Sequence, residues 1–354
     1  MTSLAMPVVL LIFMLAAGAI WTAGIQLSNQ TGVLAERLRL GSALGGLVLL
    51  AIATNLPEIA ITASAALSGQ IGIAVGNILG GIAIQTLVLV VLDLVGVRGR
   101  RPLTYQAASL VLVLEGALVV AVLVVVIAGT QMPSGLIALR VTPAALLIAV
   151  LWVAGLLLLN RARRGLPWHE QGEAPDNQGV PRGTSRTTAE QRATGTSTAK
   201  AAAIFGAAAL ITLVAGVFLE RSGEVIANQI GLTGVLFGAT VLAAATALPE
   251  ISTGLASIRN GDYQLAVSDI FGGNAFLPVL FLLATVLSGK SVLPQAHNTD
   301  IYLTALGALL TIVYLAGLLF RPARRVIGMG IDSLVVLGLY VAGIAGLIAI
   351  ASSS

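Results

Sequence analysis

Two short segments repeat a proline followed by a glutamate inside long apolar stretches. ATNLPEIAIT spans residues 53–62, and ATALPEISTG spans residues 245–254. A proline within a helix frees a backbone carbonyl and kinks the helix. An unpaired glutamate at the bilayer centre costs on the order of several kcal/mol. Beside a bound cation, however, carbonyl and carboxylate oxygens become ligands, and the cation offsets the cost of burying them. The two segments are therefore the candidate halves of one cation site.

The composition is that of a membrane protein. The chain has 354 residues, of which 57% are hydrophobic and 10% are charged, against roughly 25% charged residues in soluble domains. The absence of cysteine excludes disulfides, thiolate metal sites and cysteine nucleophiles. The net charge of +4 comes from arginines at membrane edges, so we expect no nucleic-acid partner. No basic residue precedes Arg37, which favours a retained first span over a signal peptide.

Apolar runs of about 20 residues recur along the chain, each long enough to cross a bilayer. The expected spans are residues 6–27, 40–67, 70–92, 105–128, 136–159, 200–219, 232–258, 263–288, 300–320 and 329–351. Residues 161–199 are rich in Gly, Ser, Thr, Pro and charge, which is typical of a flexible linker. We therefore expect two halves of five spans, at 1–160 and 200–354.

The basic residues are distributed unevenly over the expected loops. Sixteen of the 19 lie in alternate loops and in the linker, and three lie on the opposite side. The positive-inside rule makes the richer side cytoplasmic. We expect a multi-pass protein of the inner (plasma) membrane, with both termini outside and the 161–199 linker in the cytoplasm.

The two halves are an internal repeat. A shift of 192 residues aligns LGSALGGLVLLAIATNLPE at 40–58 with LTGVLFGATVLAAATALPE at 232–250, without a gap. Each half has an odd number of spans, so the second copy is inserted upside down. Inverted repeats with interrupted helices near the midplane are typical of secondary transporters. The paired glycines Gly80, Gly81, Gly272 and Gly273 are expected mainly to allow close helix packing.

The Thr-x-Leu-Pro-Glu pair, each copy followed by a segment of small residues, resembles the cation/calcium exchanger superfamily, in particular its prokaryotic sodium/calcium exchanger branch. The resemblance covers residues of about 38–92 and 230–284. It implies an all-α polytopic membrane protein with about ten transmembrane helices, arranged as two inverted five-helix repeats with broken helices at the midplane. It also implies that the chain is an antiporter and not an enzyme.

The resemblance assigns ion-binding roles by position. The carboxylates fall on Glu58 and Glu250, the threonines on Thr54 and Thr246, and the backbone-carbonyl residues on Ala51 and Ala243. Asn55 and Gln85 stand at further ligand positions of the first repeat and could supply amide oxygens, whereas Ala247 and Leu277 stand at their counterparts. Gly81 and Gly273 replace two motif serines. Several oxygen ligands of the family pattern are therefore absent.

These departures leave the transported ions open. Calcium needs about six to eight oxygens, and the remaining residues can approach that number, but sites for several sodium ions are harder to build. We expect exchange of Ca²⁺ for Na⁺, with a cation/proton antiporter (Ca²⁺/H⁺ or another cation) as the alternative. Inorganic cations and the lipid bilayer are the expected partners, with no cofactor and no evident protein partner.

Other ionisable residues in the spans have more than one candidate role. Asp269, which aligns with Asn77, is a further candidate residue of the cation site, and it could line an access path, carry a proton or make a structural hydrogen bond. Glu115 is expected to be a packed carboxyl, with a proton relay as the second interpretation. Three aspartates near span ends are expected to reach toward water, namely Asp93, Asp300 and Asp332.

Two other classes of protein compete with the antiporter. An intramembrane metalloprotease is disfavoured because HExxH is absent and both histidines fall in loops. An aspartyl protease is disfavoured because the counterpart of Asp269 is an asparagine. A channel would use similar ligands, and flux without a counter-ion would distinguish it from an antiporter.

Overall fold

The computed structural model describes residues 4–37, 51–163, 165–167, 197–231, 237–259 and 261–353. Almost all of these residues are helical, and the strands among them are the antiparallel pair β1 (Arg325–Val326) and β2 (Met329–Gly330). The α-helices are α1 (Met6–Arg37), α3 (Leu56–Ser68), α4 (Ile71–Val91), α5 (Leu103–Ala107), α6 (Leu110–Thr130), α7 (Pro143–Arg163), α9 (Thr198–Ile230), α11 (Ala243–Thr246), α12 (Leu248–Arg259), α13 (Tyr263–Phe276), α14 (Leu280–Ser288), α15 (Asn298–Phe320) and α16 (Ile331–Ser353). Short π-helical or 3₁₀ segments join some of them, namely η2 (Leu92–Gly96), η3 (Gly238–Leu242), η4 (Leu277–Val279) and η5 (Leu293–Gln295).

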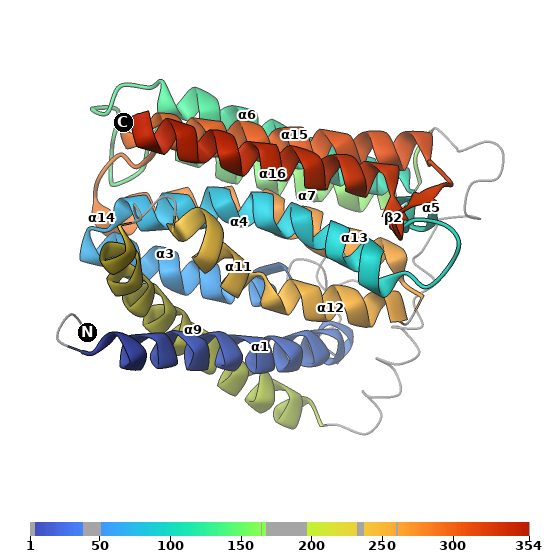
Figure 1. The fold of residues 1–354 in the computed structure, drawn as a ribbon, viewed down its shortest axis with the longest axis horizontal. Coiled ribbons are helices and arrows are strands. Elements are labelled where there is room, and N and C mark those ends of the chain that lie inside the picture. The colour runs from blue at the N-terminus through green and yellow to red at the C-terminus, as the bar shows by residue number, and fades with distance from the viewer. Residues whose placement is uncertain are drawn as a thin grey trace.

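The helices form three layers in Figure 1. Helices α6, α7, α15 and α16 lie on one side, and α1 and α9 lie on the other. The middle layer holds α3, α4 and α11 to α14. In the most apolar stretch of the span Ile71–Gly96, 72% of the residues are buried inside the protein, and in that of Tyr263–Ser288 67% are. In Ile331–Ala351 only 17% are buried. The two middle spans are therefore the centre of the bundle, and the outer helices face lipid.

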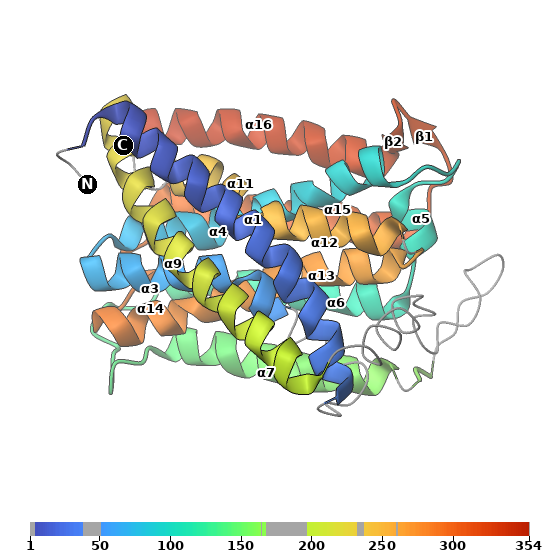
Figure 2. The same ribbon diagram turned by 90° about the horizontal axis from the view of Figure 1, so that it is seen from below.

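The helix positions reproduce the 192-residue repeat. Three pairs of helices begin 192 residues apart: α1 and α9 at Met6 and Thr198, α3 and α12 at Leu56 and Leu248, and α4 and α13 at Ile71 and Tyr263. Figures 1 and 2 show α1 and α9 side by side and running in opposite directions. The repeats are thus inverted with respect to each other, as the sequence predicts.

The described residues contain eight helices that are long and apolar enough to cross a membrane, or nine if the bent pair Gly238–Thr246 and Leu248–Arg259 is one span. Part of the expected span 40–67 (residues 40–50), part of the span 232–258 (residues 232–236) and most of the 161–199 linker lie outside the described residues. Two expected spans are too short, because α1 continues to Arg37 and α9 to Ile230. Gly231, in the left-handed conformation, ends α9.

Both repeats contain a broken helix at the Pro-Glu segment. Asn55 interrupts the helix before α3, and Ala247 interrupts it between α11 and α12, where the axes bend by 46°. In Figure 1, α3 and α12 run from the middle of the bundle toward opposite ends. The beginnings of these two half-helices therefore point toward the same central region.

The prediction that the aspartates near the span ends reach toward water is wrong. Asp93, Asp300 and Asp332 are all buried. Asp93 accepts hydrogen bonds from the backbone N–H of Leu103 at 2.9 Å and of Gly330 at 2.6 Å, and Asp300 accepts one from the N–H of His297 at 2.7 Å. Asp93 and Asp300 thus satisfy backbone donors where the chain enters or leaves a helix, which compensates for their burial.

Candidate cation site

Glu58 and Glu250 occupy equivalent places in the two half-helices. Each is the third residue of its helix and follows a proline at the second position. Proline fits the first turn because the N–H that it lacks would have no partner there. The side chains of Glu58 and Glu250 are 0% and 1% exposed. The positive end of a helix dipole lies beside each carboxylate and partly offsets its charge.

The side chain of Gln85, on α4, brings the two glutamates together. Its Nε2 atom is 3.5 Å from Oε1 of Glu58 and 3.5 Å from Oε1 of Glu250. Because both oxygens lie at that distance from one nitrogen, they are at most 7 Å apart. A calcium ion binds oxygens at about 2.3–2.6 Å, so the space between the carboxylates has the scale of a cation site.

The first repeat contributes further polar groups beside this pair. Gln85 Nε2 also donates to Oδ1 of Asn55 at 3.3 Å, and Asn55 Nδ2 donates to the carbonyl of Ala51 at 2.7 Å. The hydroxyl of Thr54 lies 3.4 Å from the same carbonyl. The Ala51 carbonyl also accepts the backbone N–H of Asn55 at 3.2 Å. The carbonyl of Ala51, an expected ion ligand, therefore accepts hydrogen bonds from Asn55 in this structure.

The second repeat contributes fewer groups. Thr246 donates to the carbonyl of Ala243 at 3.2 Å, and that carbonyl also accepts the N–H of Ala247 at 3.0 Å. Pro57 and Pro249 leave the carbonyls of Ala53 and Ala245 without an i→i−4 donor. The assignment of Ala51 and Ala243 as ligands stays a prediction.

Asp269 is linked to the central pair through a threonine that the sequence analysis did not single out. The Thr253 hydroxyl donates to Oδ2 of Asp269 at 2.7 Å and lies 3.2 Å from the backbone carbonyl of Glu250. Among the described residues, no three acidic, histidine or cysteine side chains gather closely enough to hold a metal ion. The central site thus has two carboxylates, and Asp269 lies beside it.

A second connection between the repeats was also missed. Asn274 Nδ2, on α13, donates to the hydroxyl of Thr86 on α4 at 3.0 Å, and Thr86 donates to the Ile82 carbonyl at 2.7 Å. Thr86 directly follows Gln85 in the chain, so this bond fixes α4 against α13 next to the bridging amide. Its adjacency to Gln85 was the signal available in the sequence.

The paired glycines behave differently in the two repeats. A side-chain methyl on Gly80 would clash with the backbone of Ala239, so the backbones of α4 and η3 can pack this closely only because residue 80 is glycine. A methyl on Gly273 would lie 3.1 Å from both Asn55 Nδ2 and Gln85 Oε1. Gly273 therefore leaves room for the two amides of the site. Gly272 has no neighbour within 4 Å of that position, so the packing interpretation fails there.

Comparisons with known proteins agree with this architecture. The family described as "Sodium/calcium exchanger protein" matches residues 8–160 and 200–349. The inner membrane protein YrbG of Escherichia coli is 29% identical over 261 residues, which are 72% of each chain.

Two solved structures have the same fold. The H⁺/Ca²⁺ exchanger CAX superposes with a TM-score of 0.65 at 14% identity, covering 96% of this chain and 82% of the other. The sodium–calcium exchanger NCX_Mj superposes with a TM-score of 0.57 at 16% identity, covering 96% and 99%.

The matched family is one of exchangers, so the chain is a multi-pass membrane transporter and not an enzyme. The family match covers most of the sequence and both repeats. It agrees with the inverted helices and with the paired Pro-Glu segments on which the resemblance rests. The chain therefore belongs to the sodium/calcium exchanger protein family.

Proposed function

We propose that the chain is a secondary active antiporter that exchanges calcium for sodium across the inner (plasma) membrane. The observation that carries the proposal is the pair Glu58 and Glu250, buried on two inverted half-helices and joined by one amide. Two buried carboxylates without a counter-charge are costly in a membrane. One divalent cation between them would neutralise both charges.

The side chains around the pair offer enough oxygens for calcium. The two carboxylates carry four oxygens, and the side-chain oxygens of Asn55 and Gln85 bring the number to six, the lower limit for calcium. Oε1 of Gln85 and Oε2 of each glutamate have no hydrogen-bond partner in the protein. Rotation of the Gln85 amide would turn Oε1 toward the position that Nε2 now occupies. Thr54 and Thr246 are then supporting groups that orient the broken helices.

The inverted repeats supply a basis for alternating access. Transporters of this kind carry their site where the two repeats meet and expose it to one side at a time. The arginine distribution favours a topology with both termini outside and residues 161–199 in the cytoplasm. We also propose the division of the chain into halves at 1–160 and 200–354, with the intervening residues as a linker.

A proton-coupled cycle is the second candidate, and Asp269 favours it. The Thr253 hydroxyl lies between the Asp269 carboxylate and the backbone carbonyl of Glu250. The first repeat has an amide side chain, Asn77, at the position of Asp269. An additional carboxylate gives the site a further group that can bind and release a proton. The solved H⁺/Ca²⁺ exchanger shares the fold, which supports the same arrangement of helices for either coupling ion.

The test is calcium-45 uptake into proteoliposomes of the purified protein, with outward gradients of Na⁺, K⁺ or H⁺ imposed separately. We expect uptake with the sodium gradient and none without a counter-ion. Uptake driven by a proton gradient in sodium-free vesicles would select the second candidate. Calcium flux that needs no counter-ion gradient would identify a channel and contradict both proposals.

A further inference from the structure

A cavity outside the central pair lies between α6, α7 and α13. Its volume is about 40 Å³, room for about three waters or one partly hydrated ion. Much of the lining is apolar, including Trp152 and Phe271, but four side chains are polar: Glu115, Arg163, Ser268 and Asp269. Ala51, whose carbonyl holds Asn55 in the central site, also lines it.

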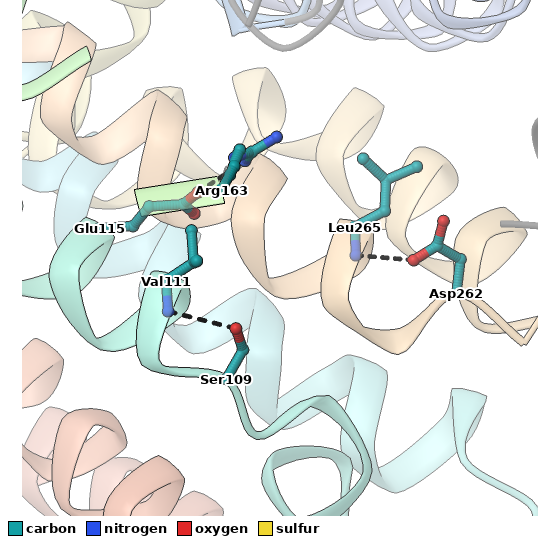
Figure 3. A network of polar contacts seen from close by, with 6 residues as sticks. All are labelled: Ser109, Val111, Glu115, Arg163, Asp262 and Leu265. Carbon is teal, nitrogen blue, oxygen red and sulfur yellow. Dashed lines mark hydrogen bonds and ion pairs between the residues drawn. The ribbon is translucent and has the colours of Figure 1, made fainter. Parts of the chain in front are cut away.

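One end of the cavity is closed by an ion pair. Arg163, in the last turn of α7, places Nη2 at 2.8 Å from Oε1 of Glu115 on α6. Figure 3 shows this pair beside the beginnings of α6 and α13, where Ser109 and Asp262 accept hydrogen bonds from the first turns. The Arg163 side chain is 16% exposed and that of Glu115 is 5% exposed. The guanidinium therefore stands at the outer edge, and the carboxylate stands inside.

Two carboxylate oxygens at the cavity have no hydrogen-bond partner in the protein. They are Oε2 of Glu115 and Oδ1 of Asp269, on side chains that are at least nine-tenths buried, and the equally buried Ser268 hydroxyl lies beside Glu115. Buried polar atoms in proteins nearly always have a partner. Unpaired oxygens that share one cavity therefore indicate a bound species that provides what the protein does not.

The charge of the cavity identifies the kind of species. Glu115 and Asp269 contribute two carboxylates, which Arg163 compensates only in part and from one end. With Arg163 in place the three side chains carry a net charge of −1. Once the guanidinium leaves Glu115, a divalent cation balances both carboxylates, and it is a good partner for carboxylate and hydroxyl oxygens. Asp269 also reaches the central pair, because Thr253 joins its Oδ2 to the backbone of Glu250.

We propose that this cavity is a second cation site, the access site, which a calcium-class divalent cation occupies on its way to or from the central pair. Glu115, Ser268 and Asp269 supply its oxygens. The Arg163 guanidinium forms its ion pair with the Glu115 carboxylate when no cation is present, and this ion pair breaks when a cation binds. The assignment as a step in transport rests on the proposed exchange function, whereas the site itself does not.

Terbium, a luminescent substitute for calcium, tests the site directly because Trp152 lines the cavity. The chain has three tryptophans, so Trp21→Phe with Trp168→Phe leaves Trp152 as the donor that sensitises bound Tb³⁺. The Glu250→Gln change is added to remove the central site. We expect sensitised emission that persists in this background and is displaced by Ca²⁺. It should be lost with Glu115→Gln or Ser268→Ala.

Glu220→Gln is the matched control, since Glu220 is another buried span carboxylate, bonded to Ser64 at 3.0 Å and absent from the cavity lining. It should leave the emission unchanged. Absence of Trp152-sensitised emission, or emission that Glu115→Gln leaves intact, would overturn the access site.

Calcium exchange gives a second readout that separates a binding role from a structural one. Glu115→Gln should raise the calcium concentration for half-maximal exchange several-fold, whereas Arg163→Gln should lower it, because the competing cation is removed. An ion pair that merely joins α6 to α7 would make both variants worse in the same direction, which would contradict the proposal. If terbium follows the expected pattern while the unaltered protein exchanges no calcium, the proposed function fails and the site stands.

Discussion

The two repeats share a backbone but differ in the polar groups that they bring to the middle of the bundle. In the first repeat the positions next to the glutamate carry amides, Asn55 and Gln85, where the second repeat carries Ala247 and Leu277. In the second repeat Ser268 and Asp269 line the cavity and Thr253 donates to Asp269. The first repeat has Gly76, Asn77 and Ile61 at the corresponding positions. The two glutamates are the acidic groups that both share.

This difference indicates which features the fold needs twice. The helix break and the proline in the first turn determine where each half-helix begins, and small residues let the helices approach, so these features recur in both copies. The side chains around the ion need only sum to one site, and one repeat can supply the amides while the other supplies the hydroxyl and the extra carboxylate. An inverted repeat therefore duplicates its helices without duplicating its chemistry.

The largest effect is expected at the shared positions. Glu58→Gln and Glu250→Gln should each reduce calcium exchange by more than about 100-fold, since removing one charge of a buried ionic group costs about 3–5 kcal/mol. Calcium-45 flux in proteoliposomes measures the loss, and gel filtration checks that the protein is still folded. Near-normal flux in either folded variant would mean that the central pair does not bind the ion.

The second-largest effect is expected at Gln85, where the first repeat has an amide side chain and the second repeat has Leu277. Gln85→Leu gives the first repeat the residue of the second and removes the N–H that reaches both glutamates. We expect exchange to fall by about 10- to 100-fold, the range for groups that position ligands, and the change also removes one of the proposed calcium-binding oxygens. Leu277→Met is the control at the equivalent buried position, where a change of similar volume usually costs less than about 1.5 kcal/mol. Equal losses in the two variants would show that the repeats are not specialised here.

A smaller effect is expected from Asp269→Asn, which gives the second repeat the residue of the first. Asparagine keeps a hydrogen-bonding partner for Thr253 and removes the negative charge. Calcium exchange driven by sodium should fall by about tenfold, at the lower limit for groups outside the direct ligands of the central pair. A loss confined to uptake driven by a pH gradient would instead assign Asp269 to proton coupling and favour the second candidate function.

The sequence predicted the repeat, its inversion and the two half-helix glutamates because each of these features can be recognised from short stretches of sequence. Thr-x-Leu-Pro-Glu occurs twice at one offset, and span parity follows from hydropathy alone. The helices begin at the predicted offset of 192 residues, as Leu56 and Leu248 show. The role of the glutamates as ion ligands is still a prediction, to be tested by the flux experiments.

Contacts between distant segments were not predictable in the same way. Arg163 and Glu115 lie 48 residues apart on different helices, and no local pattern pairs them. The Asp93 contacts with Gly330 and Ser333 join residues 237 and 240 positions apart, so a burial prediction from span position alone was wrong.

The smallest effect is expected at a pair of glycines that the repeat makes equivalent. Gly80→Ala should lower the apparent Tm in detergent by several degrees, because its methyl group would meet the Ala239 backbone and overpacking costs about 1–3 kcal/mol. Gly272→Ala, 192 residues on, should leave Tm unchanged or slightly higher, because nothing lies within 4 Å and alanine favours a helix by about 0.5–1 kcal/mol. Thermal unfolding followed by circular dichroism compares the two, with stability as the readout because Gly272 also lines the access cavity. A similar drop in Tm for both variants would show that the second repeat packs as tightly there as the first, so that the repeats would differ in their side chains alone.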